Sequence, residues 1–192
     1  MTKQEREAKM VRMYDRITGI DSAGMPGESW YRDSRHAVKE IYGTDWKLFC
    51  KCLAATSANC SLKANVTLAR KAVEQILSTG TIPRAGYTHT HYAGLVQVSK
   101  GRLPNGRKSQ AFARCLLGNE QHVVVDIWML RYAGIIRNAP TAREYDLIAD
   151  TVMQEAKRYD RTPAGHQAVL WGMARGSVES FSTYLLQYRL GI

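Results

Sequence analysis

Long hydrophobic stretches are missing from this sequence. A helix that spans a bilayer needs roughly 20 consecutive apolar residues, and the longest candidate, residues 122–130, is shorter and contains Asp126. The first residues, 1–7, are largely charged or polar, and no apolar segment follows them, so no secretory signal is predicted. We therefore expect no membrane partner, and a location in the cytoplasm of a bacterium or of a phage-infected host cell.

Cysteine is scarce, and its spacing excludes the common metal sites. Cys50, Cys52, Cys60 and Cys115 are separated by 2, 8 and 55 positions, so none forms the Cys-x-x-Cys pair of a zinc site or a four-cysteine iron–sulfur motif. They are typical of reduced thiols that pack as small hydrophobic residues. The alternation Thr88-His89-Thr90-His91 supplies two histidines without a third ligand. We expect neither a metal nor another cofactor.

Acidic residues are outnumbered by basic ones. The chain of 192 residues has 27 Lys and Arg against 17 Asp and Glu, which gives a formal net charge of +10. Such a surplus suits a partner that carries phosphate groups, and counterion release would make that binding depend on salt. Many basic proteins bind no nucleic acid, so the charge alone leaves the partner open. Apolar residues make up 45% of the chain and charged residues 23%, which excludes extensive disorder.

Strand-like alternation is also rare, and the apolar residues mostly recur with the period of a helix. Met10, Met13, Tyr14 and Ile17 form one such stripe. Glycine, proline and capping residues divide the pattern into about eight helices, which predicts an all-α protein. Residues 87–98 are the exception, because their pattern fits a short helix and an irregular strand equally well.

Capping signals place several of the predicted helix starts. Asp45 is predicted to cap the helix that begins at Trp46. Thr141 and Glu144 have the spacing of a capping box, and Pro163 follows Thr162 at a first-turn position. The last segment, residues 178–190, is also helical in pattern.

Two loops contain residue types that are suited to binding DNA. In residues 103–109 a glycine and two basic residues precede a predicted helix, whose N-terminal N–H groups can hold a phosphate. The alternative is an ordinary solvated turn. In residues 56–59 small polar side chains join two predicted helices, and they are suited to entering a groove or the gap left by a flipped base. The alternative is that they only turn the chain.

A lone carboxylate follows an apolar run. Asp126 comes directly after Val123-Val124-Val125, which predicts a carboxylate at the edge of the core. Asp126 can also serve as a helix N-cap, worth about 1 kcal/mol, and the two roles are compatible. In the later helical segment, residues 165–175, we expect His166 to be structural rather than catalytic.

These segments, in this order, resemble the helix-hairpin-helix DNA glycosylase superfamily, which includes endonuclease III and the 8-oxoguanine glycosylases. Residues 53–59 are similar to its first DNA-probing loop, and residues 103–108 to its hairpin Leu-Pro-Gly-Val-Gly-x-Lys. Residues 123–131 resemble its Val-Pro-Val-Asp-x-His-Met-x-Arg segment, and residues 166–175 its late helix. The hairpin is one residue shorter and has Asn105 at the first glycine. The chain is also similar to phage proteins with the same Lys-to-Asp arrangement.

The resemblance implies a two-lobed helical bundle with a cleft between the lobes. Residues 46–125 would form a central helical lobe that contains the hairpin-like loop. Residues 126–192 would form the C-terminal lobe, on which the N-terminal helices of residues 1–45 pack.

The resemblance also implies the residues of an active site. Asp126 matches the carboxylate that stabilises positive charge on the sugar or activates water. Lys108 matches the amine nucleophile of the bifunctional members, with a phosphate contact as the alternative role. The implied DNA-binding residues belong to the two loops and to the segment after Asp126: Thr56, Ser57, Asn59, Asn105, Gly106, Arg107 and Arg131.

The sequence thus predicts a monomeric DNA glycosylase, with or without AP-lyase activity, that flips and excises a damaged or modified base of double-stranded DNA. One alternative is a transferase with the same fold that hypermodifies phage DNA. The other is a non-catalytic DNA-binding module in which Asp126 only caps a helix.

Overall fold

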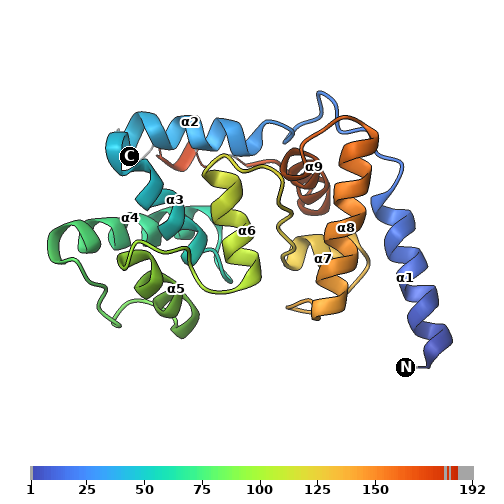
Figure 1. Ribbon diagram of the computed structural model, residues 1–192, viewed down its shortest axis with the longest axis horizontal. Helices are drawn as coiled ribbons and strands as arrows, with labels where there is room; N and C mark the ends of the chain where they lie inside the picture. The colour runs from blue at the N-terminus through green and yellow to red at the C-terminus, as the bar shows by residue number, and fades with distance from the viewer. Residues whose placement is uncertain (1, 180, 182, 186–192) are drawn as a thin grey trace. The chain divides into compact units, whose positions relative to one another are not determined.

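Figure 1 shows the computed structural model, which describes residues 2–179, 181 and 183–185. All regular elements in this part of the chain are helices, so the all-α prediction is confirmed. The elements, in chain order, are α1 (Lys3–Ile17), α2 (Trp30–Tyr42), the 3₁₀ turn η1 (Gly43–Asp45), α3 (Trp46–Ala55), α4 (Leu62–Thr79), α5 (His89–Ser99), α6 (Arg107–Leu116), α7 (Ile127–Tyr132), α8 (Ala142–Arg158) and α9 (Pro163–Arg175).

The chain divides into two compact units. Unit 1 consists of Met1–Tyr31 and Glu120–Val178, and unit 2 of Arg32–Asn119 and Glu179–Ile192. Unit 1 therefore holds α1, α7, α8 and α9, whereas unit 2 holds α3 to α6 and most of α2. These limits fall after Tyr31 and Asn119, whereas the sequence predicts lobes that begin at residues 46 and 126.

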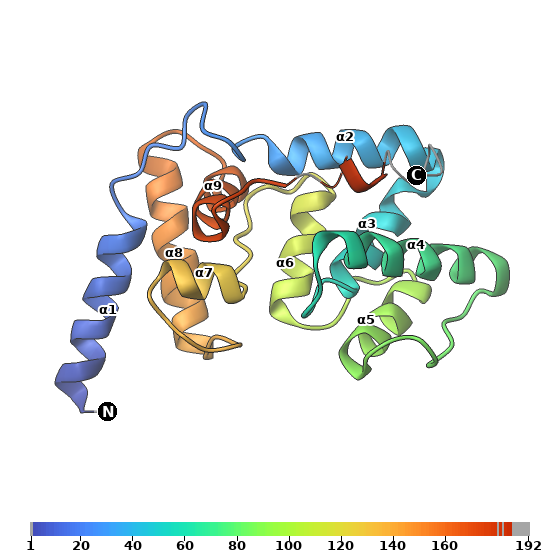
Figure 2. The same ribbon diagram turned by 180° about the vertical axis from the view of Figure 1, so that it is seen from behind.

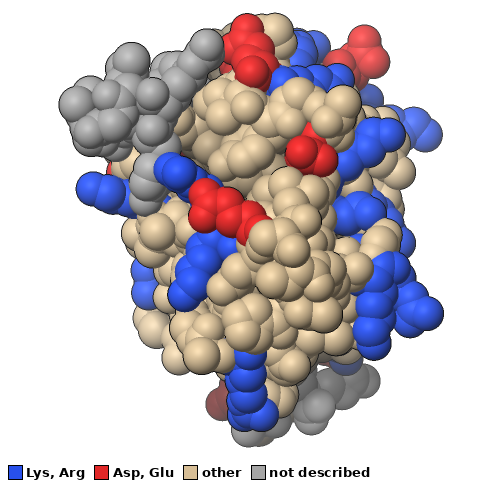
Figure 3. All heavy atoms as spheres, turned by 90° about the vertical axis from the view of Figure 1, so that its left-hand side faces the viewer, with Lys and Arg blue, Asp and Glu red and all other residues tan. Residues whose placement is uncertain are grey.

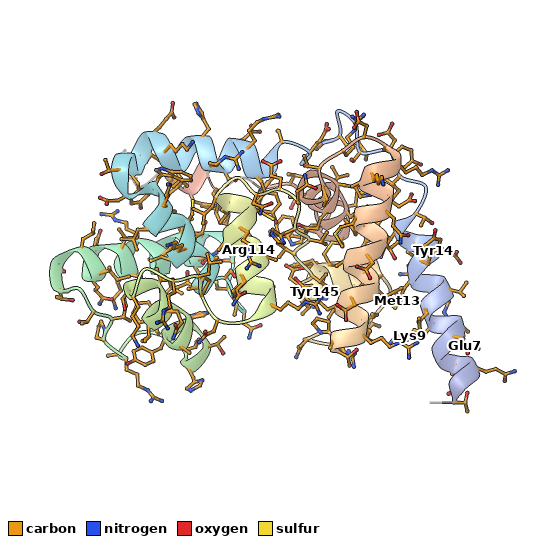
Figure 4. All side chains as sticks on the ribbon, viewed as in Figure 1. Glu7, Lys9, Met13, Tyr14, Arg114 and Tyr145 are labelled. Atoms are coloured by element: carbon orange, nitrogen blue, oxygen red, sulfur yellow. The ribbon has the colours of Figure 1, made fainter. Side chains whose placement is uncertain are left out.

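Helix α1 of unit 1 begins at a capping box. The Thr2 hydroxyl accepts a hydrogen bond from the Glu5 backbone N–H at 3.1 Å, and the Glu5 carboxylate accepts one from the Thr2 N–H at 2.7 Å. Figure 4 shows Lys9 and Met13 on the side of α1 that faces α8. The Lys9 ammonium lies 3.1 Å from a carboxylate oxygen of Glu144 in α8. Caps and one ion pair therefore supplement the apolar packing of this helix.

The core of unit 1 is formed by all four of its helices and by the segment before α7. It consists of Met13, Ile17, Val123, Val125, Met129, Leu130, Ala133, Ile135, Tyr145, Ile148, Ala149, Val152 and Leu170. The predicted stripe of α1 was wrong at Tyr14, whose side chain is 46% exposed. Successive residues of a helix are about 100° apart, and the narrow edge at Met13 and Ile17 does not extend to position 14.

Unit 2 is built around α3. Its residues Phe49 and Leu53 are fully buried, and α3 packs against α4, α5 and α6 (Figures 1 and 2). Cys50 and Cys52 lie on the same helix and are buried free thiols, as is Cys115 of α6, which confirms their prediction as small hydrophobic residues. A helix covered on several sides in this way holds the loops at its ends in fixed positions.

The predicted helix starts at Thr141 and Thr162 are confirmed. Thr141 and Glu144 form a complete capping box, and the Thr162 hydroxyl accepts a hydrogen bond from the Gly165 N–H ahead of Pro163. The prediction for Asp45 was wrong, because its side chain makes no capping hydrogen bond. Since η1 runs directly into α3, the Asp45 backbone lacks the extended conformation from which a cap side chain folds back.

Two further segments are residues 87–98, whose pattern left helix and strand open, and residues 178–190, which were predicted to be helical. Residues 87–98 contain a helix, α5, which begins at an N-cap formed by the Thr88 hydroxyl and the His91 N–H at 3.2 Å. Of the predicted helix over residues 178–190, Val178 is not helical, residues 181 and 183–185 are, and most of the rest lies outside the described residues.

Candidate functional site

Asp126 lies between a buried extended segment and the short helix α7. The preceding residues Val123–Val125 are buried. The hydroxyl of Tyr145, labelled in Figure 4 on α8, donates a hydrogen bond to the carbonyl oxygen of Val123 at 2.9 Å. This bond and the core packing fix the backbone that presents Asp126.

The carboxylate of Asp126 is held by three N–H groups. Its Oδ1 accepts hydrogen bonds from the backbone N–H of Trp128 at 2.9 Å and of Met129 at 3.0 Å, so the predicted N-cap is confirmed. Its Oδ2 accepts a hydrogen bond from the indole N–H of Trp171 in α9 at 3.0 Å. The position and the orientation of the carboxylate are therefore both fixed.

Two arginines stack on the two tryptophans whose N–H groups hold this carboxylate. The Arg131 guanidinium lies 4.5 Å from the ring centre of Trp128, and the Arg175 guanidinium lies 4.5 Å from that of Trp171 and 5.7 Å from that of Trp128. At such distances cation–π attraction orients both the rings and the charges. We call these residues, Asp126, Trp128, Arg131, Trp171 and Arg175, the Asp126 cluster.

The Asp126 carboxylate keeps spare hydrogen-bonding capacity. Asp126 is only half-buried, so its carboxylate is not sealed in the core. Each carboxylate oxygen has two lone pairs, and Oδ2 accepts a single hydrogen bond within the described residues. A lone pair of Oδ2 is therefore left for a further donor or for a developing positive charge.

Lys108 lies in unit 2, on the first turn of α6. Its ammonium donates hydrogen bonds to the Ser57 hydroxyl at 2.5 Å and to the Ser57 carbonyl oxygen at 3.2 Å, and lies 5.5 Å from the ring centre of Phe112. Lys108 is half-buried. The structure thus brings together two of the predicted site residues, one from each of the two predicted DNA-binding loops.

The loop of residues 56–61 is tied down by buried polar contacts. The Thr56 side chain is fully buried, and its hydroxyl lies 2.6 Å from Oδ1 of Asn65 and donates to the Cys52 carbonyl oxygen at 2.9 Å. The His91 ring nitrogen Nε2 lies 2.8 Å from the Ala58 carbonyl oxygen. Thr56 therefore fixes the loop from inside rather than presenting its hydroxyl at the surface.

The exposed part of this loop begins at Asn59. Asn59 has a φ of +55°, the left-handed conformation that Asn tolerates better than most residues. Cys60 follows it and is half-buried, and its thiol donates to the Thr56 carbonyl oxygen at 2.9 Å. Burial raises the pKa of the Cys60 thiol, and the nearby Lys108 charge opposes this shift. Asn59 and Ser61 are the two exposed residues of this loop.

The hairpin-like loop exposes Asn105, Gly106 and Arg107. The Asn105 side-chain amide donates to the Ala93 carbonyl oxygen at 3.4 Å, a long contact. Gly106 has a φ of +87° and stands at the start of α6 with open space where a Cβ atom would be. The first turn of α6 is accordingly accessible to a bulky group, as a phosphate contact requires.

The two predicted catalytic residues belong to different units, Lys108 to unit 2 and Asp126 to unit 1. Each is positioned within its own unit by the contacts described above. Arg131 is on the last turn of α7 and is exposed, next to Trp128.

Charge, metal and membrane features add little to this site. Figure 3 shows Lys and Arg side chains around the margin of the face on the α4 and α5 side of the molecule. Among the residues that the structure describes, no three His, Cys, Asp or Glu side chains are grouped as a metal ion would require. Within the same residues, no helix combines the length and the apolar character that crossing a membrane demands.

The sequence did not predict several residues that support the Asp126 cluster and the loop of residues 56–61. Trp171 and Arg175 lie in the segment that the resemblance singled out, but nothing in their spacing indicates that an indole N–H reaches a carboxylate 45 positions earlier. His91 and Asn65 were likewise not predicted to hold the loop of residues 56–61. Contacts between separate helices of this kind leave no local pattern in a single sequence.

The sequence profile of one protein family matches residues 1–178, and its description is a family of unknown function, DUF7178. No curated protein and no solved structure matches the chain. The matched range includes all residues of the Asp126 cluster and both predicted loops.

Proposed function

The chain belongs to the DUF7178 family, and we propose that it is a DNA glycosylase, with or without AP-lyase activity, that excises a damaged or modified base. The observation that carries the proposal is the half-buried Asp126 carboxylate, oriented by three N–H groups that include the indole of Trp171. The proposal includes a two-lobed arrangement of the helix-hairpin-helix glycosylase type, a monomeric state and a cytoplasmic location.

The chemistry of base excision accounts for these side chains. When the N-glycosidic bond breaks, its electron pair leaves with the base and positive charge develops on the sugar. A carboxylate fixed beside the sugar stabilises this charge, and it can accept a proton from the attacking water. The target base must leave the stack, and stacking it on Trp128 or Trp171 requires Arg131 or Arg175 to move off the ring. Arg131 and Arg175 offer positive charge for the backbone.

Lys108 supplies the lyase branch of the proposal. After its ammonium gives a proton to solvent, the Lys108 amine would attack the sugar C1′ as the base departs with the electron pair of the N-glycosidic bond. The adduct would then lose a second proton from nitrogen, and the C1′–O4′ bond would break with a proton going to O4′, which leaves a Schiff base. A β-elimination would then break the 3′ carbon–oxygen bond of the strand. The Ser57 hydroxyl, 2.5 Å from Nζ, orients the amine.

The decisive test separates the catalytic role of Asp126 from its role as a cap. Asn and Ser are both good N-caps, so Asp126→Asn and Asp126→Ser are expected to keep α7 and the fold. Wild-type protein and both variants would be incubated with duplexes that contain uracil, 8-oxoguanine, 3-methyladenine or 5-hydroxymethylcytosine. The proposal expects release of one base by wild type and a loss of at least about a hundredfold in both variants. Unchanged release by either variant contradicts it.

Borohydride reduction tests the lyase branch separately. A Schiff base on DNA with an abasic site would be trapped as a covalent adduct with wild-type protein and lost in Lys108→Ala. Lys63→Ala, a change at an exposed lysine of α4, is the matched control and should leave the adduct intact. Base release without any adduct would limit the activity to hydrolysis.

A non-catalytic DNA-binding module is the second candidate. The observation that favours it is that both oxygens of Asp126 already accept hydrogen bonds from the protein. Duplex binding without turnover of any modified base, unaffected by Asp126→Asn, would support this candidate over the first.

A further inference from the structure

An open concavity on unit 1 has a basic lining. Its volume is about 360 Å³, and its lining consists of Arg16 of α1, Arg131 and Tyr132 of α7, and Ala174 of α9. Both arginines are exposed, and Tyr132 is half-buried. None of these four residues is acidic. We call this feature the arginine pocket.

The Arg16 side chain is packed closely against the turn that follows α7. At Gly134, with a φ of +77°, an added Cβ atom would lie 3.0 Å from Nη1 and 3.1 Å from Cζ of Arg16. Gly134 therefore leaves the room that the guanidinium occupies. The neighbouring residue Ile17 is buried in the core, which anchors the end of α1 beside the pocket.

The Arg131 and Tyr132 side chains are also held in place. The Arg131 guanidinium stacks at 4.5 Å on the ring of Trp128, an arrangement that leaves its N–H edge available. Burial raises the pKa of Tyr132 against the opposing charge of Arg16, so its hydroxyl is a donor at neutral pH.

Neither arginine is neutralised by a neighbouring carboxylate. Within the described part of the chain, no Asp or Glu forms an ion pair with Arg16 or Arg131. Arg137 and Arg161 of the same unit, by contrast, pair with Glu144 and with Asp21 and Glu28. Two exposed guanidinium groups without a carboxylate partner in the described residues therefore line one concavity, where an anion can reach both.

We propose that the arginine pocket binds a phosphate group through Arg16, Arg131 and Tyr132. Guanidinium groups donate pairs of parallel N–H groups that match the oxygens of a phosphate, and such charge-assisted hydrogen bonds are stronger than neutral ones. The phosphate belongs to a DNA backbone or to a small phosphorylated ligand. For the DNA backbone this site rests on the proposed function, in which Arg131 already takes part; Arg16 and Tyr132 are new to it, and phosphate binding requires no reaction at Asp126.

The test measures binding by calorimetry with two probes, inorganic phosphate and a short unmodified DNA duplex. Arg16→Gln and Arg131→Gln are each expected to weaken binding about tenfold, the effect of losing about 1.4 kcal/mol of charge-assisted hydrogen bonding. For the duplex, each change should also lower by about one the number of counterions released on binding, as given by the slope of log affinity against log salt concentration. Arg12→Gln is the matched control, since Arg12 is an exposed arginine one turn earlier on α1 that does not line the pocket.

The pattern of losses identifies the source of the phosphate. Weakened binding of the duplex alone assigns the pocket to the DNA backbone, and weakened binding of inorganic phosphate assigns it to a small phosphorylated ligand as well. The proposal is overturned if wild type binds neither probe, or if both variants bind like Arg12→Gln. Arg16→Lys keeps the positive charge but lacks the paired N–H donors of the guanidinium. Its affinity for each probe should therefore lie between those of wild type and Arg16→Gln. Because an unmodified duplex offers no damaged base to release, the titration measures this site apart from base release.

Discussion

The indole N–H of Trp171 donates a hydrogen bond to Oδ2 of Asp126 over 3.0 Å. Because Oδ1 of the same carboxylate caps α7, one aspartate joins the start of α7 to the middle of α9. The two helices pack against each other within unit 1. This bond is thus structural in its own right, and it sets the direction of the oxygen that would face a substrate.

Replacing Trp171 by Phe should destabilise unit 1 and disorient the carboxylate. The change removes one hydrogen bond to a charged group, worth about 1.5–3 kcal/mol, and keeps an aromatic ring for Arg175. Urea unfolding would give the free energy of unfolding. Trp128→Phe is the control, because within the described residues the Trp128 ring contacts guanidinium groups and only the Trp128 backbone N–H bonds to Asp126. Equal losses in the two variants would show that ring size, and not the bond to Asp126, accounts for the effect.

Replacing Ser57 by Ala should loosen the loop of residues 56–61. The Lys108 ammonium would lose its 2.5 Å partner, and the unfolding free energy should fall by about 1 kcal/mol. Hydrogen exchange at residues 57–60 should become faster than in wild type. Ser78→Ala, a change at a hydroxyl that bonds only within α4, should leave that exchange unaltered. No change in exchange would mean that His91 and Thr56 suffice to hold the loop.

The four thiols should differ sharply in reactivity. Cys50, Cys52 and Cys115 are buried, and burial raises the pKa of Cys50 to about 12 and that of Cys52 still further. Since the thiolate is the nucleophile, a thiol reagent at pH 8 should modify Cys60 first and all four only in denaturant. Cys60→Ser should abolish the native reaction. Rapid native labelling of that variant would contradict the packing of α3.

His166 should make stability depend on pH. It is fully buried, with Nδ1 3.0 Å from the Ser22 hydroxyl, and burial lowers its pKa despite the opposing charges of Glu155 and Asp21. Below pH of about 6.5 the unfolded chain binds a proton that the folded chain does not. The free energy of unfolding should therefore fall as pH drops from about 6.5 toward the folded pKa.

A pair of histidine variants checks this slope. His166→Asn should flatten the pH dependence between about pH 5 and 6.5, whereas His36→Asn, at a side chain that is 76% exposed, should preserve it. An unchanged slope in His166→Asn would assign the pH dependence to other groups.

Local signals predicted most of the helical fold. The Thr141–Glu144 capping box and the Thr162-Pro163 start depend on atoms within four positions of each other, so the sequence contains the whole interaction. Tyr14 and Asp45 were mispredicted because their environment is set by other elements: α1 buries only one narrow edge, and η1 continues into α3.

The candidate site was less accessible to prediction. The cap at Asp126 could be predicted, since its donors are two and three positions away. The third donor, Trp171, and the support that His91 gives to Ala58 come from distant helices. The buried hydroxyl of Thr56 shows the converse error, because small polar side chains in a loop can point inward as readily as outward.

The split of unit 1 across the chain has a consequence for synthesis. Its first segment, Met1–Tyr31, is made well before its second, Glu120–Val178, and the whole of Arg32–Asn119 lies between them. As a nascent polypeptide leaves the ribosome, α3 to α6 can assemble while α1 still has no partner. Met13 and Ile17 of α1 then stay exposed until α7 and α8 emerge. A chaperone that binds the nascent chain would find these two apolar side chains on α1.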